Sequence, residues 1–156
     1  MKQFLIYLLS VLFVATIVCC DESGNPAQSV EVKNFANTGC KGFTRSDTEG
    51  SKEIVEYRVI HDGYLYISHQ NAIFNCCPGE LGADISTEGN TITVTEYETE
   101  NGCKCICSYD LSYEVGPLAE GETYRIIIGK KGEEQKVAEF TFNNSSTYEE
   151  ISVSRR

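Results

Sequence analysis

Six cysteines in the body of the chain are the residues whose type and spacing could do chemistry. Two of them are adjacent and three alternate with other residues, and the set is Cys40, Cys76, Cys77, Cys103, Cys105 and Cys107. In an exported protein, an even number of cysteines indicates disulfides before any other use. Six cysteines allow many full pairings, so the sequence leaves the connectivity open. Adjacent residues of an extended chain point to opposite faces, so we expect a bend near Pro78 and Gly79 to bring Cys76 and Cys77 to their partners.

A thiolate metal site is the alternative use of these cysteines. Cys76, Cys77, Cys103, Cys105 and Cys107 are soft ligands of the kind that Zn²⁺ and Cu(I) prefer. Structural zinc sites, however, take C-x₂₋₄-C pairs from a turn, whereas C-x-C-x-C on a strand spreads its sulfurs in a row. We therefore expect disulfides and no cofactor, and a periplasmic protein that handles zinc or copper remains the alternative function.

No set of residues indicates catalysis. The only histidines, His61 and His69, stand in no recognisable Ser/His/Asp, Cys/His or H-E-x-x-H context. Gly-rich phosphate loops are absent from the sequence, and the acidic residues are spread along alternating strand positions, where we interpret them as solvating charge. The sequence therefore favours a protein that is not an enzyme.

The N-terminus reads as an export signal. Lys2 precedes an apolar stretch from Phe4 to Val18, and Cys19 and Cys20 follow it. That stretch is short for a permanent membrane helix and suits a signal peptide. The segment resembles a bacterial lipobox, which implies that residues 1–19 are removed and that Cys20 carries the lipid. The acidic pair that follows Cys20 is similar to the signal that routes some lipoproteins to the outer face of the bacterial outer membrane, whereas in other lineages an Asp at this position retains the protein at the inner membrane.

The charge of the chain limits its partners. The formal net charge is −10 at pH 7, which repels nucleic acid and anionic lipid head groups. We therefore expect membrane association through the lipid alone, and no nucleic-acid partner.

Periodicity predicts an all-β domain. After a tether at residues 20–28, short stretches with period-2 alternation are separated by turn residues over residues 29–142, and residues 143–156 read as a polar C-terminal tail in which Ile151 and Val153 could add one more strand. The longest alternation covers 103–115, so we expect one half-buried strand that carries three of the cysteines on its core face. About seven or eight strands at this spacing predict an antiparallel sandwich or barrel.

One motif narrows the choice of fold. Leu118, Gly121 and Tyr124 match the L-x-x-G-x-x-Y pattern that resembles the penultimate-strand entry of fibronectin type III and related immunoglobulin-like domains. The resemblance implies that the Tyr124 hydroxyl bonds back to the backbone upstream and fixes the corner between two strands. It favours an immunoglobulin-like sandwich.

The two cysteine-bearing segments also resemble small, poorly characterised bacterial surface lipoproteins, which supports placement at the cell surface and implies no mechanism. We therefore expect a membrane-anchored binding or structural module with an unidentified protein or glycan ligand. Sandwich domains bind through loops at their ends. The candidate loops are Asn37–Lys52, Cys77–Gly82 and Glu98–Gly102.

Overall fold

The computed structural model describes residues 29–42, 52–133, 135–143 and 149–152. The predicted signal peptide at 1–19, the lipid site Cys20 and the tether at 20–28 lie outside these residues. Within the described ranges, no helix has the length and apolar character needed to cross a membrane.

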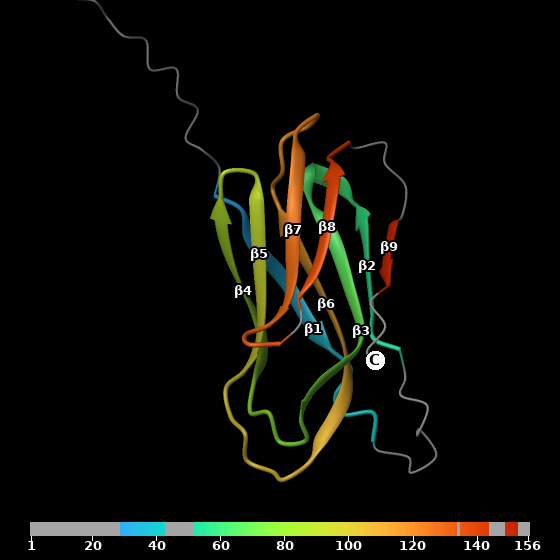
Figure 1. Cartoon of the computed structure of the whole chain (residues 1–156), viewed down its shortest axis with the longest axis vertical. Coiled ribbons are helices and arrows are strands. Elements are labelled where there is room, and N and C mark those ends of the chain that lie inside the picture. The colour runs from blue at the N-terminus through green and yellow to red at the C-terminus, as the bar shows by residue number, and fades with distance from the viewer. Residues whose placement is uncertain (1–28, 43–51, 134, 144–148, 153–156) are drawn as a thin grey trace, which may run out of the picture.

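The described residues form an all-β sandwich of two facing sheets (Figure 1). One sheet has five strands in the order β1-β6-β3-β2-β9, and the other has four in the order β4-β5-β7-β8. The strands are β1 (Glu31–Asn37), β2 (Ile54–Val59), β3 (Leu65–Asn75), β4 (Leu81–Glu88), β5 (Thr91–Glu98), β6 (Ile106–Gly116), β7 (Thr123–Lys130), β8 (Lys136–Thr141) and β9 (Glu149–Ser152), with one short 3₁₀ turn, η1 (His61–Gly63), between β2 and β3. The expected sandwich is confirmed at this level.

The expectation that every strand pair is antiparallel is wrong at one place. β5 and β7 are hydrogen-bonded in parallel, with Thr91 opposite Arg125 and Glu96 opposite Lys130. Between them the chain crosses into the other sheet as β6, which runs back to the opposite end of the sandwich. β7 therefore starts at the same end as β5 and runs in the same direction.

The segment predicted to be a polar tail contributes a strand. β9 (Glu149–Ser152) pairs antiparallel with β2, with Ile151 opposite Val55. Without it, the backbone groups along that side of β2 would lack ladder partners. The five-stranded sheet therefore extends past residue 142, where the sequence suggested that the domain ends.

The core between the sheets follows the alternation of the sequence. In the five-stranded sheet Leu65 and Ile67 of β3 are completely buried, and Ile126 and Ile128 of β7 face them from the four-stranded sheet with the same burial. Each such side chain contributes roughly 1.5–3 kcal/mol by leaving water. The packing of these side chains fixes the strands that carry the polar groups described below.

The long strand predicted over 103–115 begins later. β6 starts at Ile106, so Cys103 and Cys105 precede it and only Cys107 lies on its core face, where it is 1% exposed. The backbone carbonyl of Cys105 accepts a hydrogen bond from the Cys76 N–H at 3.1 Å. That contact and the disulfides of Cys103 and Cys105 hold the segment as a loop, although its pattern alternates like a strand.

The corner before β7 has the geometry that the fibronectin-like resemblance implies. The Tyr124 hydroxyl accepts a hydrogen bond from the Ala119 N–H at 3.0 Å. Gly121 has a φ of +80°, a backbone conformation that favours glycine, and its N–H donates to the carbonyl of Phe142 at 2.9 Å. Leu118 is buried beside them. Together these contacts fix the crossing from β6 to β7.

We predict that Tyr124→Phe lowers the free energy of unfolding by about 1 kcal/mol, because the corner loses a hydrogen bond while the ring still fills its place. Urea unfolding followed by fluorescence measures the change. Tyr97→Phe removes a hydroxyl from a ring that is 37% exposed, and should leave stability within about 0.5 kcal/mol. Equal effects of the two substitutions would contradict a special role for the corner.

Candidate functional site

Three disulfides gather at one end of the sandwich. Cys40 pairs with Cys107, Cys76 with Cys105 and Cys77 with Cys103, with Cα–Cα distances of 5.6, 5.6 and 5.4 Å. These separations lie in the usual range for disulfides. Every cysteine expected to form a disulfide is therefore paired, and the connectivity that the sequence left open is defined.

The bend that separates Cys76 from Cys77 lies earlier than expected. β3 ends at Asn75, and the Asn75 side-chain oxygen accepts a hydrogen bond from the Cys77 N–H at 2.8 Å. An asparagine that bonds the backbone two residues later forms a turn of its own. The chain therefore turns at Asn75, and the two adjacent cysteines reach separate partners, Cys103 and Cys105.

Asn75 joins two loops. Besides Cys77, its side-chain oxygen accepts from the Cys103 N–H at 3.1 Å, and its side-chain NH₂ donates to the Cys103 carbonyl at 2.6 Å and to Asn101. Its own N–H donates to the Glu98 carboxylate at 2.7 Å. A buried amide with all these partners specifies one arrangement of the loops.

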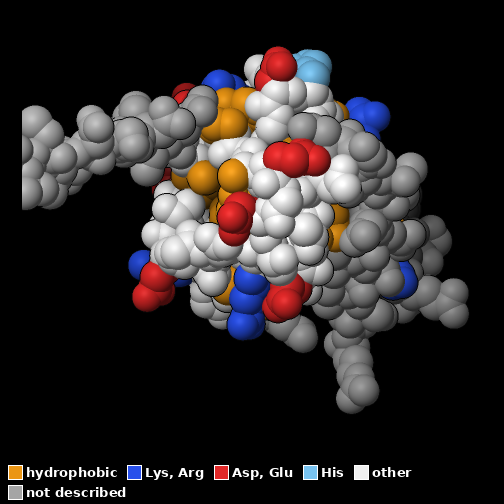
Figure 2. All heavy atoms as spheres, turned by 90° about the horizontal axis from the view of Figure 1, so that it is seen from above, with side chains coloured by type: hydrophobic (Ala, Val, Ile, Leu, Met, Phe, Trp, Pro, Cys, Tyr) orange, Lys and Arg blue, Asp and Glu red, His pale blue; other side chains and the backbone are white. Residues whose placement is uncertain are grey.

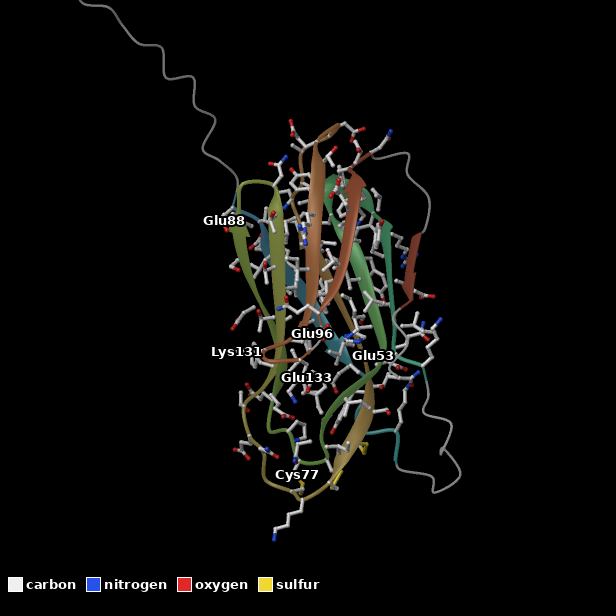
Figure 3. The ribbon with its side chains drawn as sticks, viewed as in Figure 1. Glu53, Cys77, Glu88, Glu96, Lys131 and Glu133 are labelled. Carbon is white, nitrogen blue, oxygen red and sulfur yellow. A yellow bond between two sulfur atoms is a disulfide. The ribbon has the colours of Figure 1, made fainter. Side chains whose placement is uncertain are left out.

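The candidate loops lie together at this end of the molecule. We call the described parts, residues Thr38–Gly42, Cys76–Glu80 and Thr99–Cys105, the loop end; Cys77 marks it in Figure 3. Glu100 N–H donates to the Pro78 carbonyl at 2.9 Å, and Lys41 N–H donates to the Ser108 carbonyl at 3.0 Å. At Gly79, where φ is +65°, a Cβ atom would approach Thr99 Oγ1 to 2.5 Å, so only glycine permits this close approach.

The loop end offers exposed side chains of two kinds. Lys104 is exposed within the loop end, and directly after the loop end Ile106, the first residue of β6, is 52% exposed although it is strongly apolar. An exposed apolar side chain on a cross-linked support suits contact with another macromolecule, because little side-chain or loop freedom is lost on binding.

The described residues do not support the metal alternative as they stand. Among them, no group of three or more His, Cys, Asp or Glu side chains is arranged to hold an ion. The sulfurs of all six body cysteines are bonded to each other, and metals bind the thiolate.

A second polar constellation lies between the sheets, where Glu53 and Glu96 are labelled in Figure 3. His69 of β3 contacts both carboxylates: Nδ1 lies 3.0 and 2.8 Å from the two oxygens of Glu96, and Nε2 lies 2.7 Å from Oε1 of Glu53. Lys136 Nζ donates to the same Glu53 oxygen at 2.6 Å, and the Tyr113 hydroxyl donates to Glu96 at 2.8 Å. We call these five residues the charged cluster.

Both ring nitrogens of His69 must donate if both carboxylates are ionised, so the geometry requires an imidazolium. Burial alone would lower the pKa of His69, but its hydrogen bonds to Glu53 and Glu96 outweigh burial and raise it. With His69 charged, two carboxylates face two cations and the cluster is neutral. A balanced, hydrogen-bonded set of this kind is the form in which charge is tolerated in a core.

The same contacts shift two other groups. Burial would raise the pKa of Glu53, but hydrogen bonds from His69 and Lys136 lower it to about 2. Burial raises the pKa of Tyr113 well above its usual value, and the Glu96 carboxylate adds to this. Tyr113 therefore stays a neutral donor throughout the accessible pH range.

The charged cluster corrects two sequence interpretations. Glu53 and Glu96 were expected to be solvating charge, yet they are 5% and 1% exposed, and His69 is 2% exposed. A signal was present, because Glu96 follows Ile92 and Val94 on one face of β5. In the same way, His69 follows Leu65 and Ile67 on one face of β3. Polar residues at core positions of two strands indicate that their side chains bind polar partners within the core.

The cluster has no room for a substrate. The cavity beside it has a volume of about 10 Å³ and is bordered by Lys130 and Glu133 as well as by cluster residues. That is about the space of one water molecule. A wider, open hollow of about 510 Å³ lies at the other end of the sandwich, against Val30, Ile92 and Tyr124. We therefore assign the charged cluster a structural role in holding the sheets together, and we take the loop end as the candidate functional surface.

We predict that the stability of the protein falls on acidification through the pKa of Glu53. The folded-state pKa of about 2 lies below the ordinary value of 4.5, so this stabilisation is present above pH 4.5 and is lost as the pH falls towards 2. The loss amounts to about 3 kcal/mol. Urea unfolding at a series of pH values measures it, and Glu53→Gln should flatten this part of the profile. An unchanged slope in the variant would contradict the assignment.

Comparisons with protein-family models, with curated proteins and with solved structures gave no match to this chain. What the protein does must therefore be inferred from its own geometry.

Proposed function

We propose that the protein is a lipid-anchored surface lipoprotein, and that it serves as a non-catalytic binding or structural module which presents the loop end to a partner. The observation that carries this proposal is the position of the two ends of the sandwich. β1 begins beside Gly116, at the end of β6, whereas Cys40 at the loop end is bonded to Cys107 near the start of β6. A chain anchored before β1 therefore holds the loop end away from its anchor.

The separation of the two ends is large compared with a lipid head group. β6 has 11 residues and runs from the loop end to the start of β1. At roughly 3.4 Å per residue, it places the loop end about 35 Å from the anchored end. The three disulfides keep the loops in a fixed arrangement at that distance.

The charge of the anchored end supports the same orientation. Acidic residues outnumber basic ones at this end, and Figure 2, which views it face-on, shows both kinds; the acidic residues are Glu31, Asp62, Glu88, Glu120 and Glu122, and the basic ones are Lys33, Arg58 and Arg125. Anionic lipid head groups repel such a surface. The domain would stand away from the membrane on its tether, with the loop end outermost.

We place the sandwich among immunoglobulin-like folds, with two departures. The strands β2-β3-β6-β1 occupy the positions of the A-B-E-D sheet of that fold, and β7 with its corner Tyr124 corresponds to strand F. The strand in the D position, β1, comes first in the chain, whereas strand D follows strand C. In the C-F-G sheet, strand C follows strand B directly and lies beside F. Here β4 follows β3, but β5 lies beside β7, so the β4–β5 hairpin occupies the sheet in the reverse order.

The anchor in this proposal is Cys20, exposed by removal of residues 1–19. A multiply acylated cysteine holds a protein firmly at a membrane, whereas one acyl chain does not. We place the protein at the outer membrane of a bacterium, on the cell surface, with a protein or glycan as the partner of the loop end. Its net charge of −10 disfavours nucleic acid.

The lipid anchor predicts the result of metabolic labelling. Cells that express the protein with radiolabelled palmitate should yield a labelled band, which Cys20→Ser abolishes and Cys19→Ser retains. The neighbouring cysteine is the matched control, because both substitutions change the same short segment. Label that persists in Cys20→Ser would overturn the anchor.

Surface display of the loop end is tested on intact cells. A membrane-impermeant amine reagent should modify Lys104, identified by peptide mapping, and Lys104→Arg should remove only that modified peptide. In Cys20→Ser the protein should leave the membrane fraction. Modification of Lys104 only after lysis would contradict an outward-facing loop end.

A further inference from the structure

The charged cluster connects the two sheets, and His69 takes part in one of the contacts that cross the core. His69 belongs to the five-stranded sheet, whereas Glu96 lies on β5 and Lys136 on β8 of the other sheet. Glu53, which precedes β2, contacts both His69 and Lys136. The contacts from His69 to Glu96 and from Glu53 to Lys136 therefore both cross the core.

We propose that the charged cluster is a proton-dependent latch between the sheets, closed while both ring nitrogens of His69 carry protons and released when Nε2 loses its proton. This inference goes beyond the proposed surface function and does not depend on it. It concerns how the sandwich responds to the pH of its surroundings.

The geometry decides which proton leaves. Nδ1 faces both oxygens of Glu96, whose other partner in the cluster is the neutral hydroxyl of Tyr113. Nε2 faces Glu53, which keeps the charged Lys136 as a partner. Losing the Nδ1 proton would leave Glu96 without a cation, so the proton that passes to solvent base is the one on Nε2.

After that loss, the lone pair on Nε2 faces Oε1 of Glu53 at a separation of 2.7 Å in the closed form. Two electron pairs at this distance repel each other, and the cluster carries one uncompensated negative charge in the core. Glu53 lies directly before β2, so we expect the start of β2 to be the first segment whose backbone hydrogen bonds open. Lys136 keeps its contact with Glu53, so we expect β8 to loosen with it.

Groups from every packed element face His69. They are Glu53 before β2, Glu96 on β5, Tyr113 on β6 and Lys136 on β8, and the adjoining cavity adds Lys130 of β7 and Glu133 of the β7–β8 turn. Lys130 is already paired with Glu98 at 2.8 Å, so among the described residues that border the cluster no further cation replaces the lost proton.

The direction of the pH response follows from these contacts. Burial lowers and the two carboxylates raise the pKa of His69, with a net increase above 6.5. A group whose folded-state pKa is raised stabilises the fold below its unfolded value, and this stabilisation disappears as the pH rises through the folded value. The latch therefore closes as the pH falls and opens as the pH rises through the folded-state pKa of His69, which lies above its ordinary value.

Nitrogen NMR of the full chain, labelled at histidine and held in detergent micelles, tests the closed state. The chain has two histidines, and the exposed His61 serves as an internal reference in the same spectrum. Below pH 6.5, the ordinary pKa of histidine, we expect both His69 nitrogens to show the protonated signature, and on raising the pH Nε2 alone should change to the unprotonated one. A single protonated nitrogen on His69 below pH 6.5 would overturn the latch.

Hydrogen exchange tests the release. After correction for the intrinsic effect of pH, protection of β2 and of the start of β8 should fall by about tenfold or more as His69 titrates. β4, which contributes no residue to the cluster, is the control strand. His69→Gln should remove the step while β4 remains protected. A step that persists in this variant, or one that appears equally in β4, would refute the proposal.

Discussion

Replacing Cys40 and Cys107 together by alanine should lower the free energy of unfolding by about 4 kcal/mol. This disulfide closes a loop with a sequence separation of 67, the longest of the three, and a longer closed loop restricts the unfolded chain more. Cys107 is also buried in the core, so the alanine leaves a small void that adds to the loss. Against a typical domain stability of 5–15 kcal/mol, a loss of this size is a large fraction of the total.

Guanidinium unfolding measures the effect, and the matched control is the Cys77→Ala/Cys103→Ala variant. Its disulfide has a sequence separation of 26 and should contribute about 3.5 kcal/mol. Cys77 is exposed, so this variant leaves less of a void. A larger loss from the Cys77–Cys103 pair would show that the loop end, rather than the restricted unfolded chain, dominates the stabilisation.

The second large effect belongs to the charged cluster. Glu96→Ala should lower the free energy of unfolding by about 3–5 kcal/mol, because it leaves the buried imidazolium of His69 without one of its two carboxylates. The Tyr113 hydroxyl loses its acceptor at the same time. Glu139→Ala, which removes an exposed carboxylate from β8, should change stability by no more than about 0.5 kcal/mol.

A double variant distinguishes the cost of leaving one buried charge unpaired from the cost of removing the whole His69–Glu96 pair. In Glu96→Leu/His69→Leu both charges are removed and apolar groups take their places. We expect it to be more stable than Glu96→Ala, since apolar replacement of a whole buried pair is often neutral. A double variant less stable than Glu96→Ala would mean that the hydrogen bonds of the pair, and not the unpaired charge, account for the loss of stability.

The strands were largely predictable because a period of two is a local signal. The residue alternation of β2, β5, β6 and β7 is visible in the sequence and matches the strands of the structure. The parallel pairing of β5 with β7 was not predictable, because it depends on the crossing of β6 into the other sheet. The alternation before Ile106 is equally regular, yet the disulfides of Cys103 and Cys105 override it.

The loop end was predictable in its parts and not as a whole. The sequence identified all six cysteines and the three candidate loops, but which loops share an end depends on strand order and direction. Asn75 was missed entirely, because an asparagine at a strand end carries no pattern of its own. Its role appears only when the two loops that it joins are seen to lie together.

The charged cluster shows a different limit. Glu96 and His69 could have been recognised as core residues from the apolar residues two positions away on each strand. Their mutual contact could not, since β3 and β5 belong to different sheets. Glu53 and Lys136 lie at strand beginnings, where alternation gives little guidance.

The disulfide between Cys40 and Cys107 also determines how the protein would carry mechanical force. A pull between the loop end and an anchor before β1 would pass from Cys105 to Cys107, across the disulfide to Cys40 and back along β1. This path is covalent throughout and bypasses the two-sheet core. Tension applied between the loop end and the start of β1 would therefore be carried by covalent bonds without unfolding the sandwich.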